Sequence, residues 1–322
     1  MQTIVEKLIN RRELEDSTGE LFGSFWGPYD DVQFKHSVDL FFRRLELAGV
    51  SKDFFKDKVC LDAGCGGGRN SIAMSMSGAS FVEGIDLGSE GLIDAQKRAE
   101  ALKIENIKFQ KASVLDIPFE DNHFDSIWCA GVIMITQNPT HAIKELTRVL
   151  KPGGNLYLLI YATEGIRWPL INLLRPFSAI IGRSAFEEAF LLSGEPTNKR
   201  RTFFDDLFCP KLDFFSYERV ERELRYSGIT GNIERWGEEA RIDHEESLET
   251  YQNDLQSLLN IIRGGIKIDS NKNKTNIEYF KIMENIIHST IEGIKIRAKD
   301  IGKDNVDSLL IGQGHHRVLC VK

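Results

Sequence analysis

The chain has 322 residues and a formal net charge of −7, with 42% hydrophobic and 28% charged residues. This is the composition of an ordinary globular protein with enough apolar material for a core. The acidic balance excludes a general electrostatic attraction to nucleic acid or to anionic membranes. No uncharged apolar run reaches the roughly 18 residues of a spanning helix, so we expect no nucleic-acid partner and no transmembrane segment.

The five cysteines, at positions 60, 65, 129, 209 and 320, are odd in number and form no C-x-x-C pair. This usage predicts a reducing, cytoplasmic location and argues against a disulfide framework or a structural zinc site. Neither a metal-binding carboxylate set nor a reactive cysteine trio stands out, so we expect no metal.

Short apolar runs alternate with amphipathic ones from residue 58 to about 163, which is typical of a parallel sheet covered by helices. We predict strands at 58–63, 81–86, 106–111, 124–131 and 155–162, and helices at 69–77, 89–102 and 139–150. The last helix is the best marked, because Asn138 is an N-cap residue type and Pro139 suits the first helical position.

Further along, we predict a helix at 217–227, a strand at 229–236, and a final strand at 316–322 that returns to the sheet beside 229–236. The predicted fold class is α/β, a doubly wound Rossmann-like sheet that is mostly parallel with an antiparallel final strand, plus a helical cap and a helical insertion. The expected domains are an N-terminal helical lid (1–55), a cofactor-binding core (56–163), a substrate cap (164–214), a continuation of the core (215–236), a helical insertion (237–311) and the final core strand (312–322).

The most informative segment is 62–68, in which a strand ends in Asp62 and opens into a glycine-rich turn. A dinucleotide-binding G-x-G-x-x-G fingerprint needs its third glycine where this chain has Arg69. The carboxylate ahead of the glycines favours a ligand that carries a positive charge or an amine, and would repel a pyrophosphate. A tight turn after a strand would also use glycines, so further motifs must decide.

Those motifs follow in order at 84–87, 117–119, 124–125 and 145–154. Together with the glycine turn, they resemble the small-molecule branch of class I S-adenosylmethionine-dependent methyltransferases, the methyltransferase-11 group that includes quinone-biosynthesis enzymes. The resemblance covers about a third of the chain strongly, and it implies S-adenosyl-L-methionine as the cofactor.

For the amino-acid end of that cofactor, the resemblance implies that the backbone of Gly64 and Gly66 lies against the methionine part. Asp62 would favour the ammonium group, and backbone groups around Cys129 and Ala130 would meet the same end.

For the nucleoside end, the resemblance implies that Asp86 accepts both ribose hydroxyls and that Leu87 packs on the adenine. Many relatives have an aspartate for the exocyclic amine of adenine where this chain has Ser113, followed by Val114. The Ser113 hydroxyl could accept that hydrogen bond more weakly, and Asp116 is the alternative.

The aromatic stretch 22–42 corresponds to a segment that folds over the cofactor as a lid in relatives. Trp26 and Tyr29 belong to it and are expected to stack on or bond to the ligand. His36 is our candidate catalytic residue, although a surface or helix-packing histidine is the commoner explanation.

Methyl transfer is an in-line displacement in which positioning supplies much of the rate, and a general base matters only for a poorly acidic or protonated acceptor. No Asn-Pro-Pro-Tyr-like sequence follows the fourth strand, which argues against methylation of nucleic-acid bases. We expect a small or medium-sized acceptor. The apolar segment 166–181 fits a hydrophobic or lipid-like acceptor, but packing within the cap or a homodimer interface through it explains the pattern more simply.

Three hypotheses stay open at this point. The leading one is a methyltransferase. The others are an NAD-dependent oxidoreductase, against which Arg69 argues, and a non-catalytic nucleoside-binding protein on the same fold, against which the set Asp62, Gly64, Gly66 and Asp86 argues.

Overall fold

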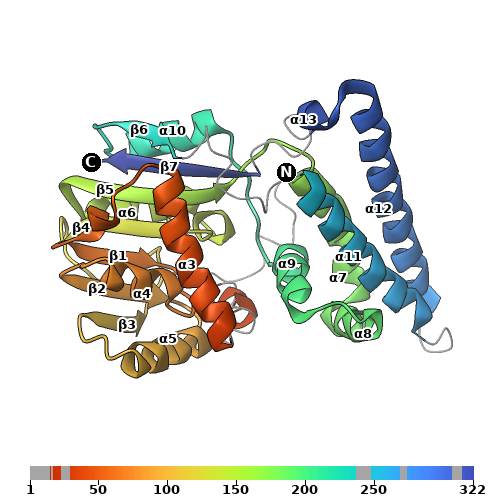
Figure 1. Ribbon diagram of the computed structural model, residues 1–322, viewed down its shortest axis with the longest axis horizontal. Helices are drawn as coiled ribbons and strands as arrows, with labels where there is room; N and C mark the ends of the chain where they lie inside the picture. The colour runs from red at the N-terminus through yellow and green to blue at the C-terminus, as the bar shows by residue number, and fades with distance from the viewer. Residues whose placement is uncertain (1–14, 16, 23–29, 237–247, 269–273, 307–313) are drawn as a thin grey trace. The chain divides into compact units, whose positions relative to one another are not determined.

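The computed structural model describes residues 15, 17–22, 30–236, 248–268, 274–306 and 314–322, and its chain forms two compact units (Figure 1). The α/β unit takes in the chain up to Tyr161, Pro210–Ile242 and His315–Lys322. The helical unit takes in Ala162–Cys209 and Asp243–Gly314. Both units are therefore built from separate stretches of chain.

The α/β unit is centred on a 7-stranded sheet with the order β3-β2-β1-β4-β5-β7-β6. β1 to β5 pair in parallel, whereas β7 runs antiparallel to both β5 and β6. The predicted doubly wound sheet with an antiparallel final strand is confirmed. The strands are β1 (Val59–Ala63), β2 (Phe81–Asp86), β3 (Ile107–Lys111), β4 (Phe124–Ala130), β5 (Leu150–Tyr161), β6 (Ile233–Arg235) and β7 (His315–Val321).

Helices cover both faces of this sheet. They are α3 (Asp31–Leu47), α4 (Arg69–Met76), α5 (Ser89–Ala101), α6 (Pro139–Val149) and α10 (Tyr217–Tyr226), with 3₁₀ turns η1 (Lys52–Phe55) and η2 (Ile133–Ile135). α6 begins as predicted, because the Asn138 side chain accepts a 3.0 Å hydrogen bond from the His141 N–H and Pro139 occupies the first turn.

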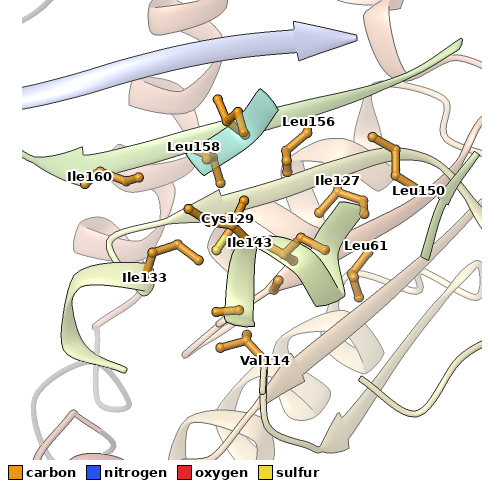
Figure 2. Packing of buried hydrophobic residues seen from close by; sticks show 14 of the residues in the cluster. Leu61, Val114, Ile127, Cys129, Ile133, Ile143, Leu150, Leu156, Leu158 and Ile160 are labelled. Carbon is orange, nitrogen blue, oxygen red and sulfur yellow. The ribbon is translucent and has the colours of Figure 1, made fainter. Parts of the chain in front are cut away.

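Successive side chains along β1 point to opposite faces of the sheet, so they belong to two different parts of the core. Leu61 and Ala63 pack with the apolar stripes of α6 and α10, in the cluster seen in Figure 2. Cys60 packs on the opposite face with α3 and α4. Asp62 shares the Cys60 face and so points toward α4. All five cysteines are buried and free.

Two predicted strands differ from the structure. The strand expected at 229–236 pairs only over Ile233–Arg235, because the turn at Gly228, with φ of 105°, first directs Ile229 into the core. β5 begins at Leu150 rather than at residue 155. The lysine-proline-glycine segment joins the sheet because the backbone of Lys322 bonds to both Gly153 and Gly154.

The helical unit contains α7 (Arg167–Ile181), α8 (Arg183–Ser193), α9 (Thr197–Phe208), α11 (Leu248–Lys267), α12 (Lys274–Ile301) and the short α13 (Lys303–Val306). Much of the chain at 164–214, where we expected helices with irregular segments, is therefore helical. The rings of Phe186, Phe204, Phe208 and Phe280 contact one another at its centre. Within the described residues, none of the helices is long and apolar enough to cross a membrane.

Candidate active site

The carboxyl ends of four parallel strands meet at one edge of the sheet. β1 lies between β2 and β4, and β3 flanks β2 on the far side. Open α/β sheets bind ligands at this edge, where the strand order reverses. The residues that follow β1, β2, β3 and β4 therefore form the candidate site.

The glycine turn after β1 has a backbone that only glycine adopts easily. Gly64, Gly66 and Gly68 have φ of 81°, 52° and 77°. A Cβ on Gly64 would overlap the Val132 side chain, and one on Gly68 would come within 2.6 Å of the Ala95 Cβ. The turn thus lies closely between the loop after β4 and helix α5.

Asp86, at the tip of β2, holds the glycine turn in place. Its Oδ2 accepts a 2.8 Å hydrogen bond from the Gly66 N–H, and its Oδ1 accepts a 2.7 Å bond from the Gly88 N–H. Burial raises the pKa of this carboxyl, while the two N–H donors oppose that rise. Because an ionised carboxylate has about four acceptor positions, Asp86 keeps capacity for further donors.

Asp62 is buried at the end of β1, with 1% of its surface exposed. The Ser71 hydroxyl on α4 donates a 2.5 Å hydrogen bond to its Oδ2, whereas Oδ1 is buried with no hydrogen-bond partner in the described part of the chain. Burial raises the pKa of Asp62 to about 7, although the Ser71 bond and the charge of Arg69 lower it. Buried carboxylate oxygens are normally satisfied, so Asp62 Oδ1 marks a place for a missing donor.

The end of β4 supplies backbone and apolar surface to the site. Cys129 is fully buried in the core, where burial raises the pKa of its thiol and the Asp62 charge adds to the rise. Its side chain packs among the apolar residues in Figure 2 and not at the sheet edge. Gly131, with φ of 79°, then turns the chain so that Val132 reaches Gly64.

The end of β3 brings Ser113 to the far side of Asp86. The Ser113 hydroxyl donates a 2.9 Å hydrogen bond to Glu15 Oε1 and accepts a 3.1 Å bond from the Leu115 N–H. The Val114 side chain packs into the core (Figure 2). Leu87 is half-buried, and the backbone of Gly19 lies against it.

Of the site residues predicted to lie in the lid, the structure describes only His36. His36 lies on α3 with an exposed side chain, opposite the buried residues Phe34, Val38 and Phe41, and its catalytic role stays a prediction. Trp26 and Tyr29 lie outside the described residues. The structure thus brings Asp62, Gly64, Gly66, Asp86, Leu87 and Ser113 to the same sheet edge as the backbone of Cys129 and Val114.

Three contacts of the site were not predicted from the sequence: Ser71 on Asp62, Val132 on Gly64, and Glu15 on Ser113. Ser71 could have been found, because a hydroxyl in the first turn of the helix after a glycine loop can reach the preceding strand end. Glu15 lies 98 positions from Ser113, and nothing in the local sequence marks it.

These carboxylate acceptors fit a nucleoside that carries an amino group. Asp62 Oδ1 needs a donor, and Asp86, which bonds to the glycine turn, can accept hydroxyl groups. Among the described residues, no group of three or more His, Cys, Asp or Glu side chains is arranged to hold a metal ion.

Comparison with known proteins agrees with this geometry. Residues 61–158 match the family model described as "Methyltransferase domain". The Coxiella burnetii (strain RSA 493) ubiquinone biosynthesis O-methyltransferase is 30% identical over 156 residues, covering 48% of this chain and 64% of the relative. The Amycolatopsis mediterranei 27-O-demethylrifamycin SV methyltransferase is 30% identical over 125 residues, covering 37% of this chain and 46% of the relative. The matched region thus spans less than two thirds of these relatives.

A solved structure shares the fold. The Haemonchus contortus phosphoethanolamine N-methyltransferase 2, solved in complex with S-adenosylhomocysteine, matches with a TM-score of 0.50 at 15% identity, covering 98% of this chain and 61% of that one. Residues 61–158 of this chain are thus similar to a methyltransferase domain, and the chain shares the fold of that solved structure.

Proposed function

We propose that this protein is a methyltransferase that binds S-adenosylmethionine along the carboxyl edge of β3, β2, β1 and β4. The observation that carries the proposal is the buried Asp62 Oδ1, which has no partner in the described structure and lies beside a turn whose glycines have positive φ. An ammonium donor satisfies that oxygen, and the same contact favours the ionised carboxylate.

The proposed roles follow the order of the strands. Asp62 and the backbone at Gly64, Gly66 and Cys129 hold the amino-acid end. Asp86 accepts the ribose hydroxyls while it keeps the turn closed through the Gly66 N–H.

The base lies beyond Asp86 and packs on Leu87, near the backbone of Ser113 and Val114. For the lid residues Trp26 and Tyr29, which lie outside the described residues, we retain the proposal of ligand contact.

The same geometry disfavours a dinucleotide. Asp62 is a buried carboxylate beside the turn where a pyrophosphate would lie. Arg69, at the first position of α4, replaces the glycine that a dinucleotide fingerprint requires. An NAD-dependent oxidoreductase is therefore the weaker alternative.

When bound, S-adenosylmethionine supplies an electrophilic methyl group: the acceptor lone pair forms the new bond, sulfur keeps the electrons of the broken bond, and a hydroxyl acceptor releases its proton. The protein's part is to orient the two reactants, because a pre-formed in-line arrangement removes much of the entropic barrier. For a hydroxyl acceptor we keep His36 as the candidate general base.

We propose a small or medium-sized, apolar acceptor that is methylated on oxygen. The relatives described above are named as a ubiquinone biosynthesis O-methyltransferase and a 27-O-demethylrifamycin SV methyltransferase. The helical unit also carries exposed leucines, Leu173 on α7 and Leu191 and Leu192 on α8, that suit an apolar acceptor. The alternative is that these leucines form a homodimer interface. Sedimentation velocity distinguishes the two explanations, because it measures whether the protein is a monomer or a dimer.

Labelled methyl transfer tests this function. The protein is incubated with methyl-labelled S-adenosylmethionine and a cell extract, and label is counted in the organic phase. We expect counts well above those of a matched Asp86→Ala sample. Equal counts in both samples, with both proteins folded, would reject methyl transfer to an apolar small molecule.

His36→Ala should lower the rate of methyl transfer without changing cofactor affinity, and an unchanged rate would remove its role as base.

A further inference from the structure

The sheet order fixes which end of the site receives the base. The glycine turn and the Asp62 oxygen lie on the β1 and β4 side of Asp86, and β3 lies on the other side. A nucleoside whose ribose is held by Asp86 and whose amino group meets Asp62 must extend its base toward the segment after β3. That segment is fixed beside Asp86, because the Ala112 N–H donates a 3.0 Å hydrogen bond to the Asp86 carbonyl oxygen.

We propose that Glu15, acting together with Ser113, recognises the exocyclic amine of the adenine base and sets the specificity for adenosyl over other nucleosides. This inference rests on the proposed binding of S-adenosylmethionine. Glu15 comes from the N-terminal part of the chain and reaches Ser113 with a 2.9 Å hydrogen bond. It is therefore a specificity residue supplied by the lid and not by the strand ends.

The hydrogen-bond inventory supports this role. The one proton of the Ser113 hydroxyl is donated to Glu15, and one of its two lone pairs accepts the Leu115 N–H. The Ser113 hydroxyl therefore has one lone pair left for a ligand, and a carboxylate such as that of Glu15 only accepts hydrogen bonds. An amine donates to such a pair, whereas a base with a carbonyl at the same position is repelled.

A second contact places the N-terminal segment on the base side. A Cβ on Gly19 would lie 3.2 Å from both the Cβ and the carbonyl oxygen of Leu87. The helical turns at 17–22 therefore lie against the residue that follows Asp86, in the same region as Glu15. Two independent contacts, at Leu87 and at Ser113, thus bring this segment to the end of the site where the base belongs.

Calorimetry with two ligands that differ at the amine edge of the base separates recognition from a merely structural contact. The ligands are S-adenosylhomocysteine and S-inosylhomocysteine, in which a carbonyl replaces the amine and the adjacent ring nitrogen carries a proton. The variants are Glu15→Gln and, as a matched control, Glu20→Gln, which changes an exposed glutamate in the same segment. The amide introduced by Glu15→Gln can donate as well as accept, so this variant should accommodate either base.

We expect the wild type and Glu20→Gln to prefer the adenosyl ligand by at least tenfold, and Glu15→Gln to reduce that preference to within threefold. Ser113→Asp alone should bind the adenosyl ligand more weakly, because two carboxylates then face each other. The double variant Glu15→Gln/Ser113→Asp moves the charge from one partner to the other and should restore the preference.

A full adenosyl preference in Glu15→Gln, with a melting temperature equal to that of the wild type, would overturn the inference while leaving the proposed function intact. Loss of affinity for both ligands by the same factor would also overturn it, since that is the signature of a structural contact. If the wild-type protein binds neither ligand, the proposed function fails and this inference fails with it.

Discussion

The two units of the chain obey different physical constraints. In the α/β unit, short stretches of sequence fix the backbone: Gly64, Gly66 and Gly68 adopt positive φ, and Asp86 bonds to the turn they form. In the helical unit, the centre is held by phenylalanine rings that other apolar residues could replace. The first kind of constraint depends on residue identity, and the second depends mainly on volume.

This difference agrees with the proposal that the α/β unit binds the cofactor and that the helical unit offers an apolar surface to the acceptor. A unit that holds one invariant cofactor needs specific residues at specific positions, whereas an acceptor-binding unit can vary while its helices still pack. If so, substitutions at the sheet edge should affect cofactor binding far more than substitutions in the helical unit.

Gly64→Ala should have the largest effect, since it adds strain at a φ of 81° and an overlap with Val132. We expect a loss of several kcal/mol in unfolding free energy and at least a hundredfold loss in affinity for S-adenosylhomocysteine. Gly153→Ala is the matched control, because its φ is 75° but its Cβ meets no atom within 4 Å. The control should lose only about 1–2 kcal/mol. Equal melting temperatures for the two variants would show that the contact with Val132 is unimportant.

Asp86→Ala should follow, with affinity for S-adenosylhomocysteine reduced by more than tenfold. The variant loses the proposed ribose contact and also leaves the Gly66 and Gly88 N–H groups without their acceptor. Glu90→Ala, at an exposed position in the first turn of α5, controls for the loss of a nearby negative charge. Titration calorimetry measures both, and an unchanged affinity in Asp86→Ala refutes the ribose role.

Asp62→Asn should change stability and binding in opposite directions. Burial raises the pKa of Asp62 from 3.8 to about 7, so the unfolded chain loses this proton at lower pH than the folded protein. Stability from this group is complete below its unfolded pKa and is lost as the pH rises to about 7. The amide cannot ionise, and it should therefore stabilise the ligand-free protein by a few kcal/mol at pH 8 and by less at pH 5.

The same variant should bind S-adenosylhomocysteine at least tenfold more weakly, because the charge that faces the ammonium group is gone. Glu83→Gln is the matched control: Glu83 is another buried carboxyl on β2 with a raised pKa and an oxygen without a partner in the described structure. It should also raise the melting temperature at pH 8 but leave affinity unchanged. Parallel behaviour of the two variants in binding would argue that Asp62 plays no special part.

Tyr251→Phe, in the helical unit, should have the smallest effect. The Tyr251 hydroxyl is buried and has no hydrogen-bond partner among the described residues, so its removal should be neutral or should stabilise by about 1 kcal/mol. Affinity for S-adenosylhomocysteine should not change. Tyr226→Phe, at an exposed position on α10, should alter neither quantity. A destabilised Tyr251→Phe protein would mean that the hydroxyl is bonded after all.

The sequence predicted what local patterns determine. The strand periodicity, the Asn138 cap and the glycine turn each depend on a few neighbouring residues, and the structure has the strands and α6 close to where they were expected. The strand predicted at 229–236 was too long, because the turn at Gly228 directs the chain into the core before it pairs with the sheet. The Glu15–Ser113 contact joins distant segments, and no local pattern encodes such a contact.

One measurement tests the central claim most directly, namely calorimetric titration of the full chain with S-adenosylmethionine, S-adenosylhomocysteine and NAD. We expect binding of both sulfur nucleosides and none of NAD. Affinity for S-adenosylhomocysteine should strengthen as the pH rises toward 7, because a larger fraction of Asp62 is then ionised. Absence of binding of either sulfur nucleoside at millimolar concentration, or tighter binding of NAD, would contradict it.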